Sequence, residues 1–426
     1  MKSHLLVLSM VSTLAIAQTP SYPDATASDP VALGLMQGFP PAADKTIRFI
    51  DGSSLRFPNT RWSFSHIREL VPTALVARDN GSPAKLPRAL KDLDSVAFTD
   101  MNGAPRTWKE MLALTYTDGV VVMHKGKIVY EKYVGALDSN GQHIAMSVTK
   151  SFVGTLASML VHEGKLDANA PVIKYLPELK ATAYGDATVR QVMDMTIGVR
   201  YSENYADPKA EIWAYAAAVG MAPIGLDYKG PRTAYDFLAG LQKEGEHDQA
   251  FAYKTVNTEV LAWILRRVSG KNFATLLSEK IWQKIGAEQD AYIAVDSIGA
   301  EMGGGGLNAN LRDFARVGEM MRLGGKFNGQ QVVPAAVVAD IANGADKAKF
   351  AKAGYKLLPN WSYRNMWWVT DYGAYSARGI HGQAIYVDPK NQMVIARFGS
   401  HPIAANAAQD PFALPAYRAV AAHLNK

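Results

Sequence analysis

The chain has 426 residues, of which 48% are hydrophobic and 20% charged, a composition typical of a globular protein with one large domain or two smaller ones. It contains no cysteine, which excludes disulfides and thiolate catalysis. The formal net charge is +6, but the basic residues are scattered along the chain, which argues against a nucleic-acid-binding protein.

The first residues have the pattern of a secretory signal peptide. A short basic start (residues 1–4) precedes a mostly apolar run (residues 5–14), and Ala15-Ile16-Ala17 has the small-x-small form of a cleavage site. The apolar run is short for a membrane span, and an uncleaved anchor is the alternative. We therefore expect residues 1–17 to be removed and the mature protein to be periplasmic or secreted, without membrane contact.

Residues 18–105 are predicted to form an N-terminal extension that packs on a main domain, residues 106–426. The extension is rich in Pro, Gly, Ser and Asp and contains only short apolar runs. The main domain is predicted to begin with a β-hairpin, because two β-branched segments (120–124 and 128–133) flank the turn signal Lys125-Gly126.

The next predicted element is a buried helix, residues 147–163, which starts with Ser147-Val148-Thr149-Lys150 and ends at Gly164. Residues three apart on a helix lie on one face, so this spacing places the Lys150 amine beside the Ser147 hydroxyl. A neutral amine there could accept the Ser147 proton and create a nucleophile. The alternative is a helix-capping serine followed by a surface lysine.

The same S-x-x-K pattern occurs a second time, at Ser82-Pro83-Ala84-Lys85. This copy follows Asn80-Gly81, a turn signal, and contains a proline. We therefore expect its lysine to be solvated and to have no catalytic role.

The middle of the chain, residues 165–290, is predicted to be mainly helical. Thr188 and Gln191 form a capping box, and an amphipathic helix over residues 257–268 stops at Gly270. Residues 303–306 are four glycines, which we interpret as a flexible turn before a helix over residues 311–323. A phosphate-binding loop is the alternative, but the required Gly-Lys-Ser/Thr ending is absent.

Strands return near the C-terminus. Residues 384–387 and 393–396 flank a turn at 388–391, and a helix over residues 415–424 closes the chain. Strands thus bracket a helical middle, which predicts an α/β (α+β) fold with one sheet built from both ends of the chain and a helical insertion. No H-E-x-x-H motif and no zinc-like His spacing occur, so we expect no metal and no cofactor. A G-x-S-x-G motif is also absent, which argues against an α/β-hydrolase.

From about residue 108 to the end, this arrangement resembles the superfamily of serine β-lactamases and penicillin-binding proteins. Within it, the chain resembles the 6-aminohexanoate-dimer hydrolases, the nylon-oligomer amidases. The resemblance is carried by the S-x-x-K motif and by three phrases: Glu203-Asn204-Tyr205-Ala206-Asp207-Pro208, residues 251–263, and Gly379-Ile380-His381-Gly382-Gln383. It implies a β-lactamase/transpeptidase-like fold, with an antiparallel sheet flanked by helices.

The resemblance also implies roles for individual residues. Ser147 would be the nucleophile and Lys150 its general base. Tyr253 would relay protons to the leaving group, and Tyr205 would contact the substrate amide. The backbone N–H of Ile380 would complete an oxyanion hole with that of Ser147.

Three further residues are expected at the oxyanion or substrate-binding site: Asn257, Gly379 and His381. Asn257 lies four residues after Tyr253, where β-lactamases often have an Asn two residues after the Tyr. The Lys-Thr-Gly motif of that superfamily is absent. Its counterpart is either Ala377-Arg378-Gly379, with Arg378 as a substitute cation, or the segment His381-x-Gln383.

The sequence therefore predicts an exported serine hydrolase that acts on small esters or linear amides through an acyl-enzyme. A β-lactamase or D-Ala-D-Ala carboxypeptidase is the first alternative, and a non-catalytic binding protein of the same fold is the second. The expected partner is a small-molecule substrate. The sequence makes no prediction of the oligomeric state.

Overall fold

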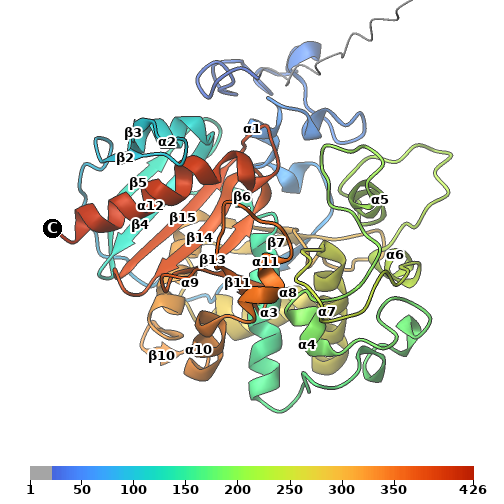
Figure 1. Cartoon of the computed structure of the whole chain (residues 1–426). Coiled ribbons are helices and arrows are strands. Elements are labelled where there is room, and N and C mark those ends of the chain that lie inside the picture. The colour runs from blue at the N-terminus through green and yellow to red at the C-terminus, as the bar shows by residue number, and fades with distance from the viewer. Residues whose placement is uncertain (1–21) are drawn as a thin grey trace, which may run out of the picture.

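The computed structural model describes residues 22–426, so the predicted signal peptide lies outside the described residues. Its centre is a seven-stranded antiparallel sheet in the order β11-β12-β13-β14-β15-β4-β5 (Figure 1). The strands are β4 (Thr117–His124), β5 (Lys127–Tyr133), β11 (Ser362–Arg364), β12 (Trp367–Val369), β13 (Tyr375–Gly379), β14 (Gln383–Asp388) and β15 (Met393–Gly399). Because β15 pairs with β4, one sheet is built from both ends of the chain, as predicted.

Both predicted hairpins are present in this sheet. Between β4 and β5, Lys125 and Gly126 have φ values of 51° and 79°, as a tight two-residue turn with left-handed backbone requires. In the turn between β14 and β15, the Asn391 N–H donates to Asp388 Oδ1 at 3.0 Å.

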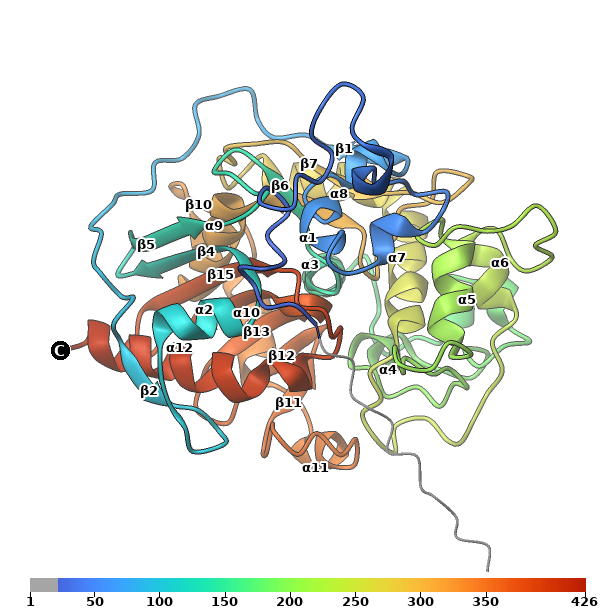
Figure 2. The same cartoon turned by 90° about the horizontal axis from the view of Figure 1, so that it is seen from above.

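Helices cover both faces of the sheet. Met393 and Ile395 of β15 pack in one apolar cluster with α2 (Trp108–Leu114) and α12 (Asp410–Leu424). Val394 and Ala396 point to the other face, into the main core with α3 (Val148–His162) and α9 (Leu311–Arg322). Figure 2 shows α2 and α12 on one side of the sheet and α9 on the other. The alternation of strand side chains thus produces a three-layer structure.

The predicted helical middle lies beside the sheet rather than on it (Figure 2). It contains α4 (Val189–Met193), α5 (Glu211–Ala218), α6 (Ala234–Ala239), α7 (Thr255–Ser269) and α8 (Phe273–Leu277). The capping box of Thr188 and Gln191 has both of its hydrogen bonds and starts α4. Helix α7 begins at Thr255, two residues before the predicted start, and ends at Gly270 with a φ of 67°. Among residues 22–426, no helix is long and apolar enough to cross a membrane.

A second sheet was not predicted. Its order is β1-β7-β8-β6, formed by β1 (Thr73–Val76), β6 (Gln142–Ile144), β7 (Ala291–Ala294) and β8 (Leu307–Asn310). Strands this short do not produce a readable alternation of polar and apolar residues.

The residues before 106 contact the rest of the molecule in several places. Strand β1 joins the second sheet through β7. The backbone of Ala89 and Lys91 donates to the carbonyls of Ile128 and Val129 on the outer edge of β5, at 2.9 and 2.8 Å. This segment covers a sheet edge that would otherwise offer unpaired backbone groups.

The predicted start of the last helix was wrong, because α12 begins at Asp410 and continues through Pro415. Pro415 has no N–H to donate to the carbonyl of Pro411. That carbonyl instead accepts a hydrogen bond from the Met101 N–H at 3.0 Å. The remaining elements are α1 (Thr60–Ser63), β2 (Ala97–Thr99), β3 (Pro105–Thr107), β9 (Lys326–Phe327), β10 (Gln330–Gln331), α10 (Ala335–Asn343) and α11 (Lys347–Ala351).

Candidate active site

Ser147 and Lys150 lie side by side at the N-terminus of α3. Ser147 is the residue that precedes the helix, and its side chain makes no capping hydrogen bond. Lys150 is 1% exposed, and its Nζ lies 3.0 Å from Ser147 Oγ. The alternative of a capping serine with a surface lysine therefore does not describe this pair.

The Lys150 amine has a second partner, the carbonyl of Gly304, at 2.5 Å. Burial lowers the pKa of Lys150 to about 8, although the carboxylates of Glu203 and Glu259 act in the opposite direction. A substantial fraction of the amine is consequently neutral near pH 8, which is the form that can accept a proton.

The four glycines before β8 form the predicted turn, which is packed inside the molecule. All four glycines are buried. A Cβ on Gly304 would lie 2.4 Å from Thr255 Cγ2, and a Cβ on Gly303 would lie 2.7 Å from the Ala262 Cβ, so both positions lack room for a side chain. The glycines let the turn pack closely against α7, beside Lys150.

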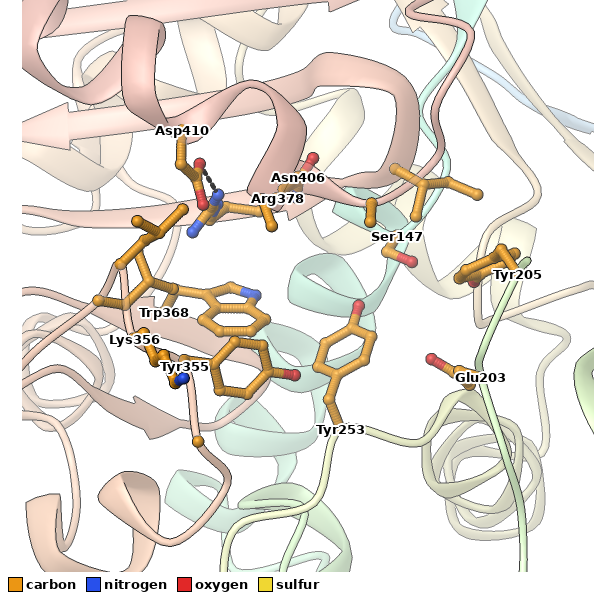
Figure 3. Close-up of a pocket in the computed structure, with 16 residues that line it drawn as sticks. Ser147, Glu203, Tyr205, Tyr253, Tyr355, Lys356, Trp368, Arg378, Asn406 and Asp410 are labelled. Atoms are coloured by element: carbon orange, nitrogen blue, oxygen red, sulfur yellow. Dashed lines mark hydrogen bonds and ion pairs between the residues drawn. The ribbon is translucent and has the colours of Figure 1, made fainter. Parts of the chain in front are cut away.

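Tyr253 lies just before α7, and its hydroxyl points toward Ser147 (Figure 3). The ring packs against Trp368, with centroids 5.3 Å apart, and edge-on against Tyr363 at 6.0 Å. Burial raises the pKa of Tyr253 well above its ordinary value, an effect that the Glu203 charge strengthens and the Ser147 hydroxyl opposes. The phenol is therefore protonated at neutral pH and can donate a proton.

The end of β13 lies against the backbone of Ser147. A Cβ on Gly379 would lie 2.7 Å from the Ala145 carbonyl oxygen and 3.0 Å from the Ser147 nitrogen, so only glycine fits there. Ile380 follows at once and lines the cavity next to Ser147. This close approach brings the backbone of Ile380 beside that of the predicted nucleophile.

A cavity of about 430 Å³ opens at Ser147, and three of the predicted site residues, Tyr205, Tyr253 and Ile380, line it. Figure 3 shows Glu203 and Tyr205 on one side of Ser147, and Arg378 and Asp410 on the other. Other lining residues were not predicted from the sequence, among them Glu203, Tyr355, Lys356, Leu357, Leu358, Trp368, Asn406 and Asp410.

Glu203 and Tyr205 come from the segment between α4 and α5. Tyr205 packs edge-on against Trp213 of α5, with ring centroids 6.1 Å apart. Glu203 Oε1 accepts the backbone N–H of Thr255 at 2.5 Å, which ties this segment to the start of α7. Burial raises the pKa of Glu203, while the charge of Lys150 acts against that rise. The sequence signal for Glu203 is that it opens the phrase, residues 203–208, that carries the family resemblance.

Arg378 of β13 is 8% exposed and lines the cavity. Its guanidinium forms an ion pair with Asp410 of α12 and lies over the ring of Trp368, 5.3 Å from the centroid. The substitute cation suggested by the sequence is therefore present at the cavity wall, but a carboxylate already pairs with its charge.

The model of the family named Beta-lactamase matches residues 115–414. The chain belongs to the β-lactamase family. This confirms the predicted resemblance and, with the observed sheets and helices, the predicted β-lactamase/transpeptidase-like fold.

Relatives within the β-lactamase family include named hydrolases. A 6-aminohexanoate-dimer hydrolase from Paenarthrobacter ureafaciens is 35% identical over 349 residues, which cover 81% of this chain and 86% of that protein. The solved structure of a presumed 6-aminohexanoate-dimer hydrolase from Bacillus anthracis aligns with a TM-score of 0.81 at 32% identity, over 89% of this chain and 99% of that one. An octameric penicillin-binding protein homologue from Pyrococcus abyssi shares the fold, with a TM-score of 0.56 at 17% identity over 75% and 76% of the two chains.

Asn257 and His381, two of the residues predicted at the substrate-binding site of this β-lactamase family member, do not line the cavity. Asn257 is fully buried on the core side of α7, where its Oδ1 accepts the Tyr184 hydroxyl at 2.9 Å. Asn257 lies two residues after Thr255, the first residue of α7. The prediction that its side chain contacts substrate therefore has no support in this geometry.

His381 also points away from the cavity. Burial lowers the pKa of His381 to about 4, so the ring is neutral, and its Nδ1 lies 2.6 Å from the His401 carbonyl. The ring packs edge-on against Phe64, with centroids 5.2 Å apart. With a φ of 63°, His381 turns the chain sharply after Ile380, so its contribution is to the shape of this segment.

The second S-x-x-K copy lies far from this arrangement. Ser82 and Lys85 are exposed and belong to no helix. Between them, the Ala84 carbonyl accepts Arg316 Nη2 at 2.8 Å. Among residues 22–426, no group of three or more His, Asp or Glu is placed to hold a metal ion.

Proposed function

We propose that this hydrolase of the β-lactamase superfamily is an exported enzyme that cleaves small esters or linear amides through an acyl-enzyme. The observation that carries the proposal is the buried Lys150 amine, 3.0 Å from the Ser147 hydroxyl at the wall of a cavity. The Tyr253 hydroxyl points at the same serine (Figure 3).

In the acylation step, neutral Lys150 accepts the Ser147 proton, and Ser147 Oγ attacks the substrate carbonyl carbon. The negative charge that develops on the carbonyl oxygen is held by the backbone N–H groups of Ser147 and Ile380. The close fit of Gly379 against the Ser147 backbone supports this assignment, because it brings the two peptide segments together.

Tyr253 then protonates the leaving amine or alcohol, which separates from the acyl-enzyme. In the second step the Tyr253 phenolate takes a proton from a water molecule, whose oxygen attacks the acyl carbon. The ester bond to Ser147 then breaks, and Ser147 Oγ takes back the proton that Lys150 holds. A phenol whose pKa is raised by burial holds its proton until a basic leaving group needs it.

Two observations favour small esters or linear amides. A cavity of about 430 Å³ falls in the range of small-molecule sites, and its aromatic walls suit an extended apolar chain. The relative that is 35% identical is named for the hydrolysis of a 6-aminohexanoate dimer, which is a linear amide.

A fluorophosphonate probe tests the nucleophile directly, because it reacts preferentially with an activated serine. We expect wild-type protein to be labelled once, on the peptide that carries Ser147, and Ser147→Ala to remain unlabelled. Absence of labelling in folded wild-type protein would favour the non-catalytic binding protein instead.

A labelled penicillin separates the proposed function from that of a β-lactamase or D-Ala-D-Ala carboxypeptidase. The chain has no Lys-Thr-Gly motif, and Asp410 pairs with the nearby Arg378. We therefore expect neither stable penicilloylation nor rapid penicillin hydrolysis. Efficient turnover or capture of penicillin would reassign the substrate class.

Export rests on the sequence of residues 1–17. N-terminal sequencing of the mature protein from a bacterial host should find Gln18 as the first residue, in the periplasm or the medium. A protein that keeps Met1 and stays in the cytoplasm would contradict this part of the proposal.

A further inference from the structure

Glu259 is a buried carboxylate on α7 with three hydrogen-bond donors. It is 3% exposed, and it does not line the cavity beside Ser147. Its Oε1 accepts the N–H of Gly304 at 2.6 Å and the hydroxyl of Tyr215 at 2.5 Å, and its Oε2 accepts the N–H of Gly303 at 3.2 Å. A carboxylate buried this deeply needs such partners, and two of them belong to one turn.

That turn connects Glu259 to Lys150. The N–H of Gly304 is bound by Glu259, and the carbonyl of the same residue accepts the Lys150 amine at 2.5 Å. A Cβ on Gly304 would lie 2.4 Å from Thr255 Cγ2 and 2.8 Å from Glu259 Oε1, so the turn is wedged between α7 and Lys150.

We propose that Glu259 is a positioning residue for the reaction: by binding the N–H groups of Gly303 and Gly304, it holds the Gly304 carbonyl that orients the Lys150 amine toward Ser147. The inference rests on the proposed role of Lys150 as the general base. A neutral amine has two hydrogens and one lone pair. Donating one hydrogen to a fixed carbonyl restricts rotation about the terminal C–N bond and leaves only two orientations of the lone pair, one of which faces the Ser147 hydroxyl.

The charge of Glu259 has a second effect, which acts against base catalysis. The carboxylates of Glu259 and Glu203 both favour the protonated form of Lys150, whereas burial favours the neutral form. Two other titratable side chains lie here: Tyr253 contacts Lys150, and Tyr215 donates its hydroxyl hydrogen to Glu259. Burial keeps both phenols protonated at neutral pH. Glu259 and the Gly304 carbonyl thus stabilise the ammonium by charge and by hydrogen bonding.

Glu259→Gln tests the proposal in the full-length protein. Glutamine keeps the shape but offers a single acceptor oxygen, and its NH₂ group would face N–H donors. We expect the turn to shift and the plateau of kcat/KM to fall by roughly 10²-fold, the usual result of a displaced catalytic group. The acidic limb of the kcat/KM–pH profile should move to lower pH by about half a unit or more, because the ammonium form loses stabilisation.

Glu301→Gln is the matched control. Glu301 is a second buried carboxylate, two residues before Gly303, and it accepts the Ala274 N–H at 3.3 Å and pairs with Arg266. It contacts neither glycine of the turn nor Lys150, so its variant should keep the wild-type plateau and pH profile within about two-fold. Thermal unfolding of every variant separates lost stability from lost positioning.

Gly304→Ala is a second variant that should displace the same carbonyl, and it is used if Glu259→Gln does not fold. Its methyl group would displace the turn while the Glu259 charge remains, so the plateau should again fall. The proposal would be overturned if folded Glu259→Gln or Gly304→Ala kept both the wild-type plateau of kcat/KM and the wild-type acidic limb. A variant that loses thermal stability but keeps both kinetic properties would overturn it as well. Fluorophosphonate labelling of Ser147 is measured in parallel, since failure of wild-type labelling would contradict the proposed function instead.

Discussion

The two sides of Ser147 are held in place by different physical means. On the Lys150 side, buried charges and hydrogen bonds connect Glu259, the glycine turn and the amine. On the Ile380 side, the backbone of Gly379 packs against that of Ala145 and Ser147 with no room for a side chain. The first side is sensitive to charge and pH as well as to volume, and the second to volume alone.

This difference matches the chemistry required on each side. A general base must gain and lose a proton, so its surroundings have to place its pKa near the working pH. Oxyanion stabilisation needs fixed dipoles that do not reorganise during the reaction. Substitutions on the two sides should therefore differ in pH dependence even where they lower the rate equally.

The largest effect should come from Ser147→Ala, because Ser147 belongs to both sides. We expect hydrolysis of p-nitrophenyl esters to fall by about 10³-fold or more while the fold survives. Ester turnover and circular dichroism of the purified variant check this. Substantial turnover by the folded variant would place the nucleophile elsewhere.

Tyr253→Phe should lower the rate by roughly 10²–10⁴-fold, the usual contribution of a general acid–base group. One hydroxyl is lost and little volume changes, so stability should hardly alter. The loss should be larger for amides than for p-nitrophenyl esters, because an amine leaves poorly without a proton. The ratio of amide to ester kcat/KM in both proteins is the measurement. If that ratio and both rates stay at the wild-type level, Tyr253 is a packing residue and Tyr205 is the next candidate.

Gly379→Ala tests the side that depends on volume. The added methyl group would lie 2.7 Å from the Ala145 carbonyl, so β13 must move away from Ser147. We expect kcat to fall by roughly 10²-fold, as when an oxyanion-hole donor is displaced. The acidic limb of the pH profile should stay in place, since no charge near Lys150 changes. A shifted limb would show that the two sides are not independent.

The pH profile of the wild-type enzyme reports on the Lys150 side. Lys150 must be neutral to accept a proton, and burial lowers its pKa to about 8. The reactive fraction therefore rises with pH, and kcat/KM should increase roughly ten-fold between pH 7 and pH 9. Initial rates with an ester of low intrinsic hydrolysis check this. Activity that falls over the same range would mean that Lys150 acts as a cation.

The smallest effect is expected for Ser82→Ala, in the other S-x-x-K copy. Ser82 is exposed and outside any helix, so activity and stability should stay within error of wild type. The same ester assay and thermal melt are sufficient. A large loss of activity would show that the wrong copy has been assigned.

The sequence predicted what depends on local spacing. The Ser147–Lys150 pair follows from the geometry of one helical turn, and the hairpin at Lys125-Gly126 follows from its turn residues. The pairing of Arg378 with Asp410 and the contact of Glu259 with Gly304 join residues far apart in sequence, and no local pattern encodes them. The glycine turn was interpreted as flexible because composition alone does not show that α7 packs against it.

The pairing of β15 with β4 has a consequence for how this protein is made. The edge of β4 opposite β5 receives its partner only from residues 393–399. During synthesis, the β4–β5 hairpin therefore emerges early and waits for almost the entire remaining chain before the sheet can close. Until then, the unpaired backbone groups of β4 form an exposed sheet edge. For a protein exported as we propose, late closure also prolongs the interval in which the unfolded chain can still thread through a translocation channel.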